Sequence, residues 1–153
     1  MKAFSFRLES LLQLRESSRE KALISYAKSI NARQKIEVEL HTLHDVLTKL
    51  HKDITMQRTS SLEGFTDQSF QNSMDSTKLQ ILNFHGKLED AKKIELSKKK
   101  IFLAADGSLQ SILRLKDKQS TAHLSSQLKK EERELDDIIS SRFVSQSISA
   151  IKK

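Results

Sequence analysis

The side chains best suited to metal chemistry in this sequence are His41, His44, Asp45 and His51. The first three recur at helical spacing on one face, and His and Asp are common zinc ligands. A closed zinc site needs three or four converging ligands, which one helical face seldom supplies. We therefore interpret this group as a solvated face, and we expect neither a metal nor another cofactor.

No second group of residues indicates a catalytic centre. The 153-residue chain has no Cys, and its three scattered Gly cannot form the glycine-rich loops that bind phosphates. Ser residues are plentiful, but a Ser/His/Asp set also needs a pocket, and the sequence predicts none. We expect a protein that is not an enzyme and has no catalytic residues.

Five basic residues lie close together in the second half of the chain. They are Lys92, Lys93, Lys98, Lys99 and Lys100. With a formal net charge of +7, such a cluster could contact nucleic acid or anionic lipid. Acidic residues stand among them, so we expect a solvated face on which the lysines pair with Glu89, Asp90 and Glu95. Glu89–Lys93 and Glu95–Lys99 have the favourable i,i+4 spacing. We expect no nucleic-acid partner, and a basic coiled-coil binder of nucleic acid or anionic membrane stays an alternative.

The composition predicts long solvated helices. There is no Pro, and 31% of residues are charged against 37% that are hydrophobic. Average proteins contain about 5% Pro, so sharp turns should be few here. The longest apolar run, Ile101 to Ala105, is far shorter than the ~20 residues that span a bilayer. Arg7 and Glu9 stand where a signal peptide would be apolar, so we expect a cytoplasmic protein.

A heptad pattern runs through residues 1–57. Its members recur at alternating spacings of four and three, which keeps one stripe of a helix facing a partner helix. They are Leu8, Leu12, Arg15, Arg19, Ala22, Tyr26, Ser29, Arg33, Ile36, Leu40, Leu43, Leu47, Leu50 and Ile54. We expect a first coiled-coil helix that begins by Phe4 to Phe6 and is loosened from Arg15 to Arg33 by polar stripe residues.

Residues 58–66 interrupt this pattern with Gly64 and several Ser and Thr. Ser60 and Glu63 have capping-box spacing, and Thr66 with Asp67 favours the start of a second helix. A short connection between helices predicts antiparallel neighbours. The second stripe is Phe70, Met74, Thr77, Ile81, Phe84, Leu88, Ala91, Glu95, Lys98, Phe102, Ala105, Leu109 and Ile112. We therefore expect a connector over 58–66 and a second coiled-coil helix over 67–142.

Beyond Ile112 the apolar phase slips by one residue, which indicates a local change of supercoil. The new stripe is Leu124, Leu128, Glu131, Leu135, Ile138 and Arg142. The Ser-rich residues 143–153 should fray. The predicted fold is all-α: a long antiparallel two-helix coiled-coil hairpin with both chain ends at one end. Because the second helix is longer, either it overhangs or the connector doubles back.

Three segments resemble the FliJ family, the soluble coiled-coil component of the bacterial flagellar export apparatus. The opening, residues 4–16 (FSFRLESLLQLRE), resembles the family's N-terminal pattern. Residues 115–119 (LKDKQ) resemble its Leu-x-Asp-basic-Gln segment. Residues 129–137 (KKEERELDD), followed by Arg142, resemble its charged segment. Order and spacing agree over nearly the whole chain.

This resemblance implies an antiparallel two-helix coiled coil similar to the central stalk subunit of rotary ATPases. Family members associate with the hexameric flagellar export ATPase through the chain ends. They contact the export gate membrane protein through the hairpin side, and they assist export chaperones and cargo. The implied location is the cytoplasmic face of the inner membrane at the flagellar base, with peripheral membrane association through partners. The equivalent stalk protein of a virulence type III secretion system is an alternative.

The resemblance also implies two sets of binding residues. The ATPase-binding set is Phe4, Phe6, Arg7, Leu8, Leu11, Leu12, Arg15, Leu135, Ile138 and Arg142. Near the N-terminus the apolar face is wider than a hairpin stripe needs, which separately suggests docking there. The export-gate-binding set is Leu43, Val46, Leu50, Phe70, Met74, Thr77 and Ile81. Some family members have an aromatic residue at the positions of Val46 and Leu50 and a His at the position of Ile81. Packing between the two helices explains this set equally well.

Overall fold

The computed structural model describes residues 3–60 and 64–151, which form two long helices, α1 (Glu9–Thr59) and α2 (Gly64–Ile151). No strand occurs in these two ranges. The chain divides into two compact units, each described here by itself. We call Ser18–Asp106 the hairpin unit, and residues 1–17 with 107–153 the terminal unit. Both helices contribute to both units.

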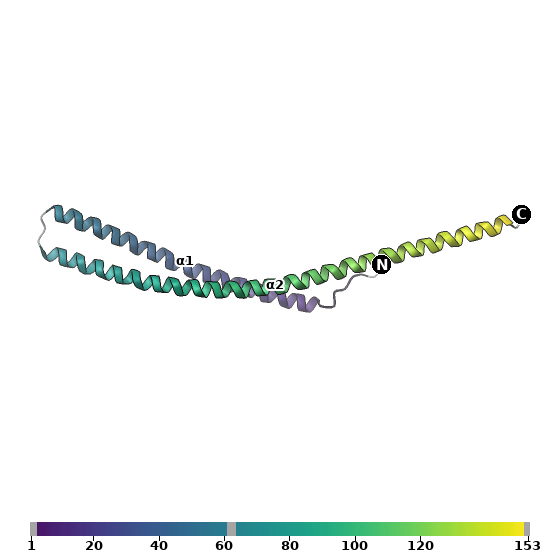
Figure 1. The fold of residues 1–153 in the computed structure, drawn as a ribbon, viewed down its shortest axis with the longest axis horizontal. Helices are drawn as coiled ribbons and strands as arrows, with labels where there is room; N and C mark the ends of the chain where they lie inside the picture. The colour runs from purple at the N-terminus through teal and green to yellow at the C-terminus, as the bar shows by residue number, and fades with distance from the viewer. Residues whose placement is uncertain (1–2, 61–63, 152–153) are drawn as a thin grey trace. The chain divides into compact units, whose positions relative to one another are not determined.

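In the hairpin unit α1 and α2 run antiparallel and side by side (Figure 1). Leu40, Ile81 and Leu88 form its buried core, each at most 9% exposed, with Ile36 and Leu43 among the residues packed against them. Each buried Leu or Ile contributes roughly 1.5–3 kcal/mol relative to an exposed position. The prediction of an all-α, antiparallel two-helix coiled-coil hairpin is confirmed.

The two heptad stripes coincide with the packed faces of the helices. Every member of the second stripe, from Phe70 to Ile112, is buried or half-buried. In the first stripe only Leu8 and Arg15 are exposed. The period of three and four therefore predicted which residues face the other helix.

Two of the polar members of the first stripe, Arg19 and Arg33, bind acidic residues of α2. Arg19 Nε donates a hydrogen bond to Asp106 Oδ1 at 2.7 Å. Arg33 bonds to Glu95 on α2 and, at 2.6 Å, to Glu37 on its own helix. The sequence predicted loosening from Arg15 to Arg33. Arg15 is exposed, whereas carboxylates on α2 satisfy the guanidinium groups of Arg19 and Arg33 within the packed face.

Two further contacts, a hydrogen bond and an aromatic stack, lie in this polar region of the hairpin unit. Ser29 is 8% exposed, and its hydroxyl donates to the Tyr26 carbonyl oxygen at 2.6 Å. The Tyr26 ring stacks on Phe102 with centroids 6.1 Å apart. A small buried hydroxyl and a stacked aromatic pair thus replace the branched aliphatic residues found elsewhere in the stripe.

In the terminal unit residues 3–8 are not helical, although the sequence predicted a helix starting by Phe4 to Phe6. Phe6 is 6% exposed and packs with Leu12 and Leu109 in a small buried cluster. The Glu9 N–H donates to the Phe6 carbonyl oxygen at 3.2 Å, which starts α1 there. The carboxylate of Glu9 also lies in the first turn, where it interacts favourably with the helix dipole.

The N-terminal segment covers the face of α2 beyond Ile112. Phe4 reaches His123 with ring centroids 5.7 Å apart, and Lys116 Nζ lies 5.8 Å from the Phe6 ring centroid. Lys116 also donates to the Glu9 carboxylate at 2.8 Å. Half-buried residues continue along α2 at Lys116, Ser120, His123 and Gln127. At Ser120 and Gln127 they lie one residue beyond the original phase, whereas Leu124 and Leu128 of the predicted new stripe are exposed.

From Leu128 to Ser147 every side chain of α2 is exposed. Of the two arrangements expected for the longer second helix, the structure has the overhang. Residues 128–147 of α2 therefore extend beyond the packed region of the terminal unit that the structure describes.

The helix boundaries differ modestly from those predicted. α1 ends at Thr59, two residues beyond the expected 57, and α2 begins at Gly64 instead of residue 67. Residues 61–63, which include Glu63 of the predicted capping box, lie outside the described residues. α2 runs through the segment expected to fray and reaches Ile151, and fraying there stays a prediction. Within the described ranges, neither helix has a stretch both long and apolar enough to cross a bilayer.

Candidate docking surfaces

A row of exposed apolar residues runs along the C-terminal part of α2 in the terminal unit. We call it the apolar stripe, and its members are Leu124, Leu128, Leu135, Ile138 and Ile139. Their side chains are between 50% and 63% exposed. At 3.6 residues per turn they lie along one side of the helix. An aligned row of exposed Leu and Ile marks a surface for a partner.

Two charged residues, Glu131 and Arg142, lie on the same side of α2 as the apolar stripe, and both are exposed. In a parallel pair of two copies of α2, Glu131 would face Glu131 and Arg142 would face Arg142, and both like-charge contacts are unfavourable. A different protein with an acid opposite Arg142 and a base opposite Glu131 would complement the stripe, and so would an antiparallel second copy, in which Glu131 faces Arg142.

The predicted ATPase-binding residues fall into two groups that the structure does not bring together. In the N-terminal group Phe6 and Leu12 are buried and Phe4 and Leu11 are half-buried. The exposed members of that group are Arg7, Leu8 and Arg15, and the whole C-terminal group is exposed: Leu135, Ile138 and Arg142. The Phe4 ring contacts α2 at His123, and Leu135 lies about 18 Å farther along α2 at 1.5 Å per residue.

Most of the predicted gate-binding residues lie in the packed face of the hairpin unit. Thr77 and Ile81 are buried, and Leu43 packs against the core formed by Leu40, Ile81 and Leu88. Leu50, Phe70 and Met74 are half-buried, whereas Val46 is 42% exposed. The structure thus gives most of this set a packing role, and Val46 is its most accessible member.

Lysines of the hairpin unit pair with the acids beside them, as the sequence predicted for Glu89 and Asp90. Lys92 Nζ donates to Glu89 at 3.0 Å, and Lys93 lies 3.7 Å from Asp90. Of the two i,i+4 pairs, Glu89–Lys93 is an electrostatic attraction without an ion-pair contact, and Glu95–Lys99 is wrong because Glu95 binds Arg33. The hydrogen bond from Lys92 lowers the pKa of Glu89. Hydrogen bonds to Glu95 and then Glu37 raise the pKa of Arg33.

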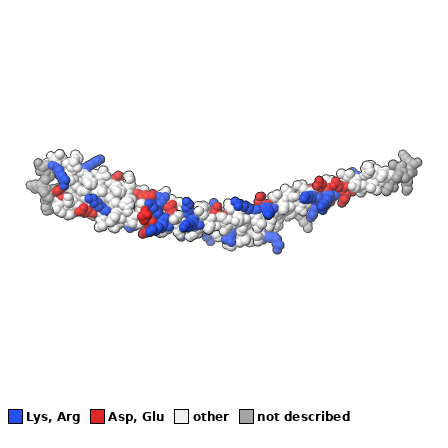
Figure 2. Space-filling model, in the orientation of Figure 1, with Lys and Arg blue, Asp and Glu red and all other residues white. Residues whose placement is uncertain are grey.

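The remaining members of the lysine cluster, Lys98, Lys99 and Lys100, form no ion pair with any side chain that the structure describes. Figure 2 shows blue and red side chains intermixed along the chain instead of one continuous basic surface. This intermixing weakens the attraction for a polyanion.

The histidines considered for metal chemistry form two separate contacts. His41 Nε2 lies 3.5 Å from Asp45, with both side chains well exposed. The His44 ring meets the His85 ring edge-on, with centroids 6.1 Å apart. Among the described residues no three His, Cys, Asp or Glu side chains converge in a way that could hold a metal ion.

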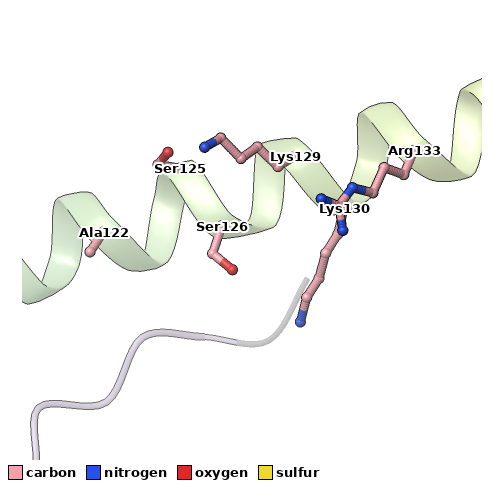
Figure 3. A pocket seen from close by; sticks show the side chains of 6 residues that line it. All are labelled: Ala122, Ser125, Ser126, Lys129, Lys130 and Arg133. Atoms are coloured by element: carbon pink, nitrogen blue, oxygen red, sulfur yellow. The ribbon is translucent and has the colours of Figure 1, made fainter.

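A second surface of the terminal unit is basic, and it was not singled out from the sequence. An open hollow of about 410 Å³ is lined on α2 by Ala122, Ser125, Ser126, Lys129, Lys130 and Arg133. Figure 3 shows Ser125 and Lys129 directed to one edge of this face and Ser126 and Lys130 to the other edge, with Arg133 reaching across the face toward Lys130. We call these six residues the basic face. Their recurrence at three- and four-residue spacing was the available sequence signal.

Comparison with protein families gives one match for this chain. The sequence model of a family described as "Flagellar FliJ protein" matches residues 4–147. Comparison with curated proteins finds no match. Comparison with solved structures finds none either.

Proposed function

The chain belongs to the flagellar FliJ family and is a component of the flagellar export apparatus, and from this premise we propose that it is a non-enzymatic stalk. In this proposal it couples the hexameric export ATPase to the export gate membrane protein and assists export chaperones and their cargo. It acts in the cytoplasm, at the inner membrane beneath the flagellum, and reaches the membrane through its partners.

The observation that carries the proposal is the uncovered apolar stripe of α2. A stalk needs a surface that its ATPase can hold, and Leu135 and Ile138 offer about half of their side-chain area or more to a partner. Arg142 lies on the same side of α2 and would bind a carboxylate of the ATPase through its guanidinium group. We place the main ATPase contact here.

The N-terminal part of the ATPase-binding set divides into contact and packing residues. Arg7, Leu8 and Arg15 are exposed, so we assign them to ATPase contact. Phe6 and Leu12 are buried against Leu109, so we assign them to holding the N-terminal segment on α2. Substituting Phe6 or Leu12 would then affect the ATPase through the shape of the terminal unit.

For the export gate we propose contact through the hairpin unit around Val46. The half-buried Leu43, Leu50, Phe70 and Met74 would contribute their accessible edges, whereas Thr77 and Ile81 support that surface from within the packed face. A Val46→Asp substitution should weaken gate binding without unfolding the hairpin unit, because Val46 is already 42% exposed.

The experiment that tests the proposal combines the purified chain with the export ATPase from the same genome. The ATP hydrolysis rate or ring assembly should rise, and the double charge reversal Arg7→Glu/Arg15→Glu should reduce the increase. If the chain interacts with neither the ATPase nor the gate, the proposal is wrong.

A second candidate function rests on Lys98, Lys99 and Lys100, which have no carboxylate partner in the part of the chain that the structure describes. These residues could bind nucleic acid or an anionic membrane. Binding of that kind weakens steeply as salt increases. A salt-dependent affinity for DNA or anionic vesicles that Lys98→Glu/Lys100→Glu abolishes would favour this function over the stalk.

A further inference from the structure

Among the described residues, the cations of the basic face of α2 have no ion-pair partner, although acids stand nearby in the sequence. Glu132 follows Lys129 by three residues, and Glu134 and Asp137 follow Lys130 and Arg133 by four. Such spacings allow pairing on a helix. None of these pairs forms in the part of the chain that the structure describes, whereas Lys92 and Lys93 both pair with acids at this range.

The two hydroxyls of the basic face are also unpaired. Ser and Thr side chains in helices often donate to the carbonyl one turn earlier, as Thr121 does to Asp117 at 2.9 Å. Ser125 and Ser126 form no such bond within the described residues. The hollow therefore presents two free hydroxyl donors beside two ammonium groups and one guanidinium group.

This set of donors fits carboxylates. An Arg guanidinium binds a carboxylate through two parallel hydrogen bonds, and the Lys and Ser donors could hold further oxygens. Lys130 and Arg133 lie close together on one side of α2 (Figure 3), so an anion between them would also relieve their mutual repulsion.

The neighbouring charges select the kind of partner. Residues 129–137 hold three basic and five acidic side chains. A nucleic acid or an anionic membrane presents continuous negative charge and would be repelled by the acids. A protein segment presents discrete carboxylates, and it can place a basic residue opposite Asp136 and Asp137.

The basic face lies on the opposite side of α2 from the apolar stripe. At about 100° per residue, Lys130 is about 160° from Leu128, and Arg133 is about 160° from Leu135. One partner can therefore cover the stripe while a second contacts the basic face.

We propose that the basic face is a docking site for a carboxylate-rich segment of a protein partner, independent of the apolar stripe. The partner contributes carboxylates that bind Lys129, Lys130 and Arg133. This site adds to the proposed coupling function and does not depend on it, because its contacts lie on a different side of α2.

The test uses the full chain labelled with ¹⁵N and a synthetic helical peptide that has a block of Glu followed by a block of Lys. The peptide should shift the amide resonances of residues 125–133 and leave those of residues 98–100 unchanged. A peptide of the same composition with Glu and Lys interleaved, anionic vesicles and duplex DNA serve as comparison probes. Each of these should bind at least about tenfold more weakly, since charge complementarity sets specificity.

The variant Lys129→Glu/Lys130→Glu/Arg133→Glu should weaken peptide binding at least about tenfold, and the neutral variant Lys129→Gln/Lys130→Gln/Arg133→Gln should also weaken it. The matched control Lys98→Glu/Lys99→Glu/Lys100→Glu and the stripe variant Leu135→Ser should leave the affinity unchanged. Circular dichroism checks that the variants stay helical. Equal shifts at residues 98–100, tighter binding of vesicles or DNA, or no binding would each overturn the proposal.

Discussion

Arg19 on α1 donates a hydrogen bond from its Nε to Asp106 Oδ1 on α2 at 2.7 Å, although the two residues are 87 positions apart in the chain. This pair fixes the alignment of the two helices in a part of the packed face where aliphatic residues are sparse. Polar residues in a coiled-coil seam often set register in this way.

We expect the Arg19–Asp106 pair to contribute modestly to stability. The side chains are 39% and 31% exposed, and pairs with such access to water contribute about 0.2–1 kcal/mol. A double-mutant cycle with Arg19→Ala and Asp106→Ala, followed by urea unfolding, measures this coupling. Arg19→Ala should cost more than Asp106→Ala, because Arg19 also lies over the Phe102 ring at 5.5 Å. A coupling of zero at low salt would show that the pair does not form in solution.

A buried leucine of the hairpin unit should matter far more than an exposed one. Leu40 is 8% exposed and Leu79 is 60% exposed. Leu40→Ala should lower the free energy of unfolding by about 2–4 kcal/mol through lost packing, whereas Leu79→Ala should change it by less than about 0.5 kcal/mol. Urea unfolding followed by circular dichroism compares the two variants. Similar effects at both positions would contradict the assigned packed face.

Fluorescence of a single introduced tryptophan should show whether the N-terminal segment contacts α2, because the natural chain contains no Trp. In Phe4→Trp the indole should emit at a shorter wavelength than in the control Phe143→Trp, whose parent side chain is 75% exposed. Adding His123→Ala to Phe4→Trp should move the emission towards that of exposed tryptophan, because the Phe4 ring packs on His123. Identical emission from the two reporters would show that the segment does not pack on α2.

The ion pair of Glu89 with Lys92 should make a small, pH-dependent contribution. The hydrogen bond from Lys92 lowers the pKa of Glu89 below its usual 4.5. The unfolded chain therefore binds the proton more readily, so the contribution is present above about pH 4.5 and is lost as the pH falls through the lowered pKa. The difference in thermal midpoint between the natural chain and Glu89→Gln should shrink from pH 7 to pH 3. A difference that stays constant over this range would contradict the pairing.

The heptad pattern predicted the packed faces of the hairpin unit because burial there follows helical periodicity alone. The pattern did not predict that Arg33 binds Glu95, because Glu95 lies four residues before Lys99 and could pair with it on the same helix. The i,i+4 spacing suggested the Glu95–Lys99 pair, whereas in the structure the Glu95 carboxylate binds the Arg33 guanidinium group of α1.

The terminal unit was harder to predict, because its contacts do not follow a coiled-coil pattern. Phe4, Phe6 and Leu8 alternate at every second residue, which is typical of an extended segment and was the available signal. The spacing of Leu124 and Leu128 indicated an apolar face, but periodicity does not reveal whether anything covers it. In the structure Leu124 and Leu128 are exposed. The docking surface was therefore inferred from the exposed fractions of these side chains.

The most direct test of the proposed stalk function is the ATP hydrolysis rate of the cognate export ATPase with three forms of the chain. The natural chain should raise the rate. Leu135→Ser/Ile138→Ser should lose most of this increase, whereas the control Leu103→Ser, which replaces a leucine of α2 that is 55% exposed, should retain it. Full activation by the stripe variant, or no activation by the natural chain, would contradict the proposal.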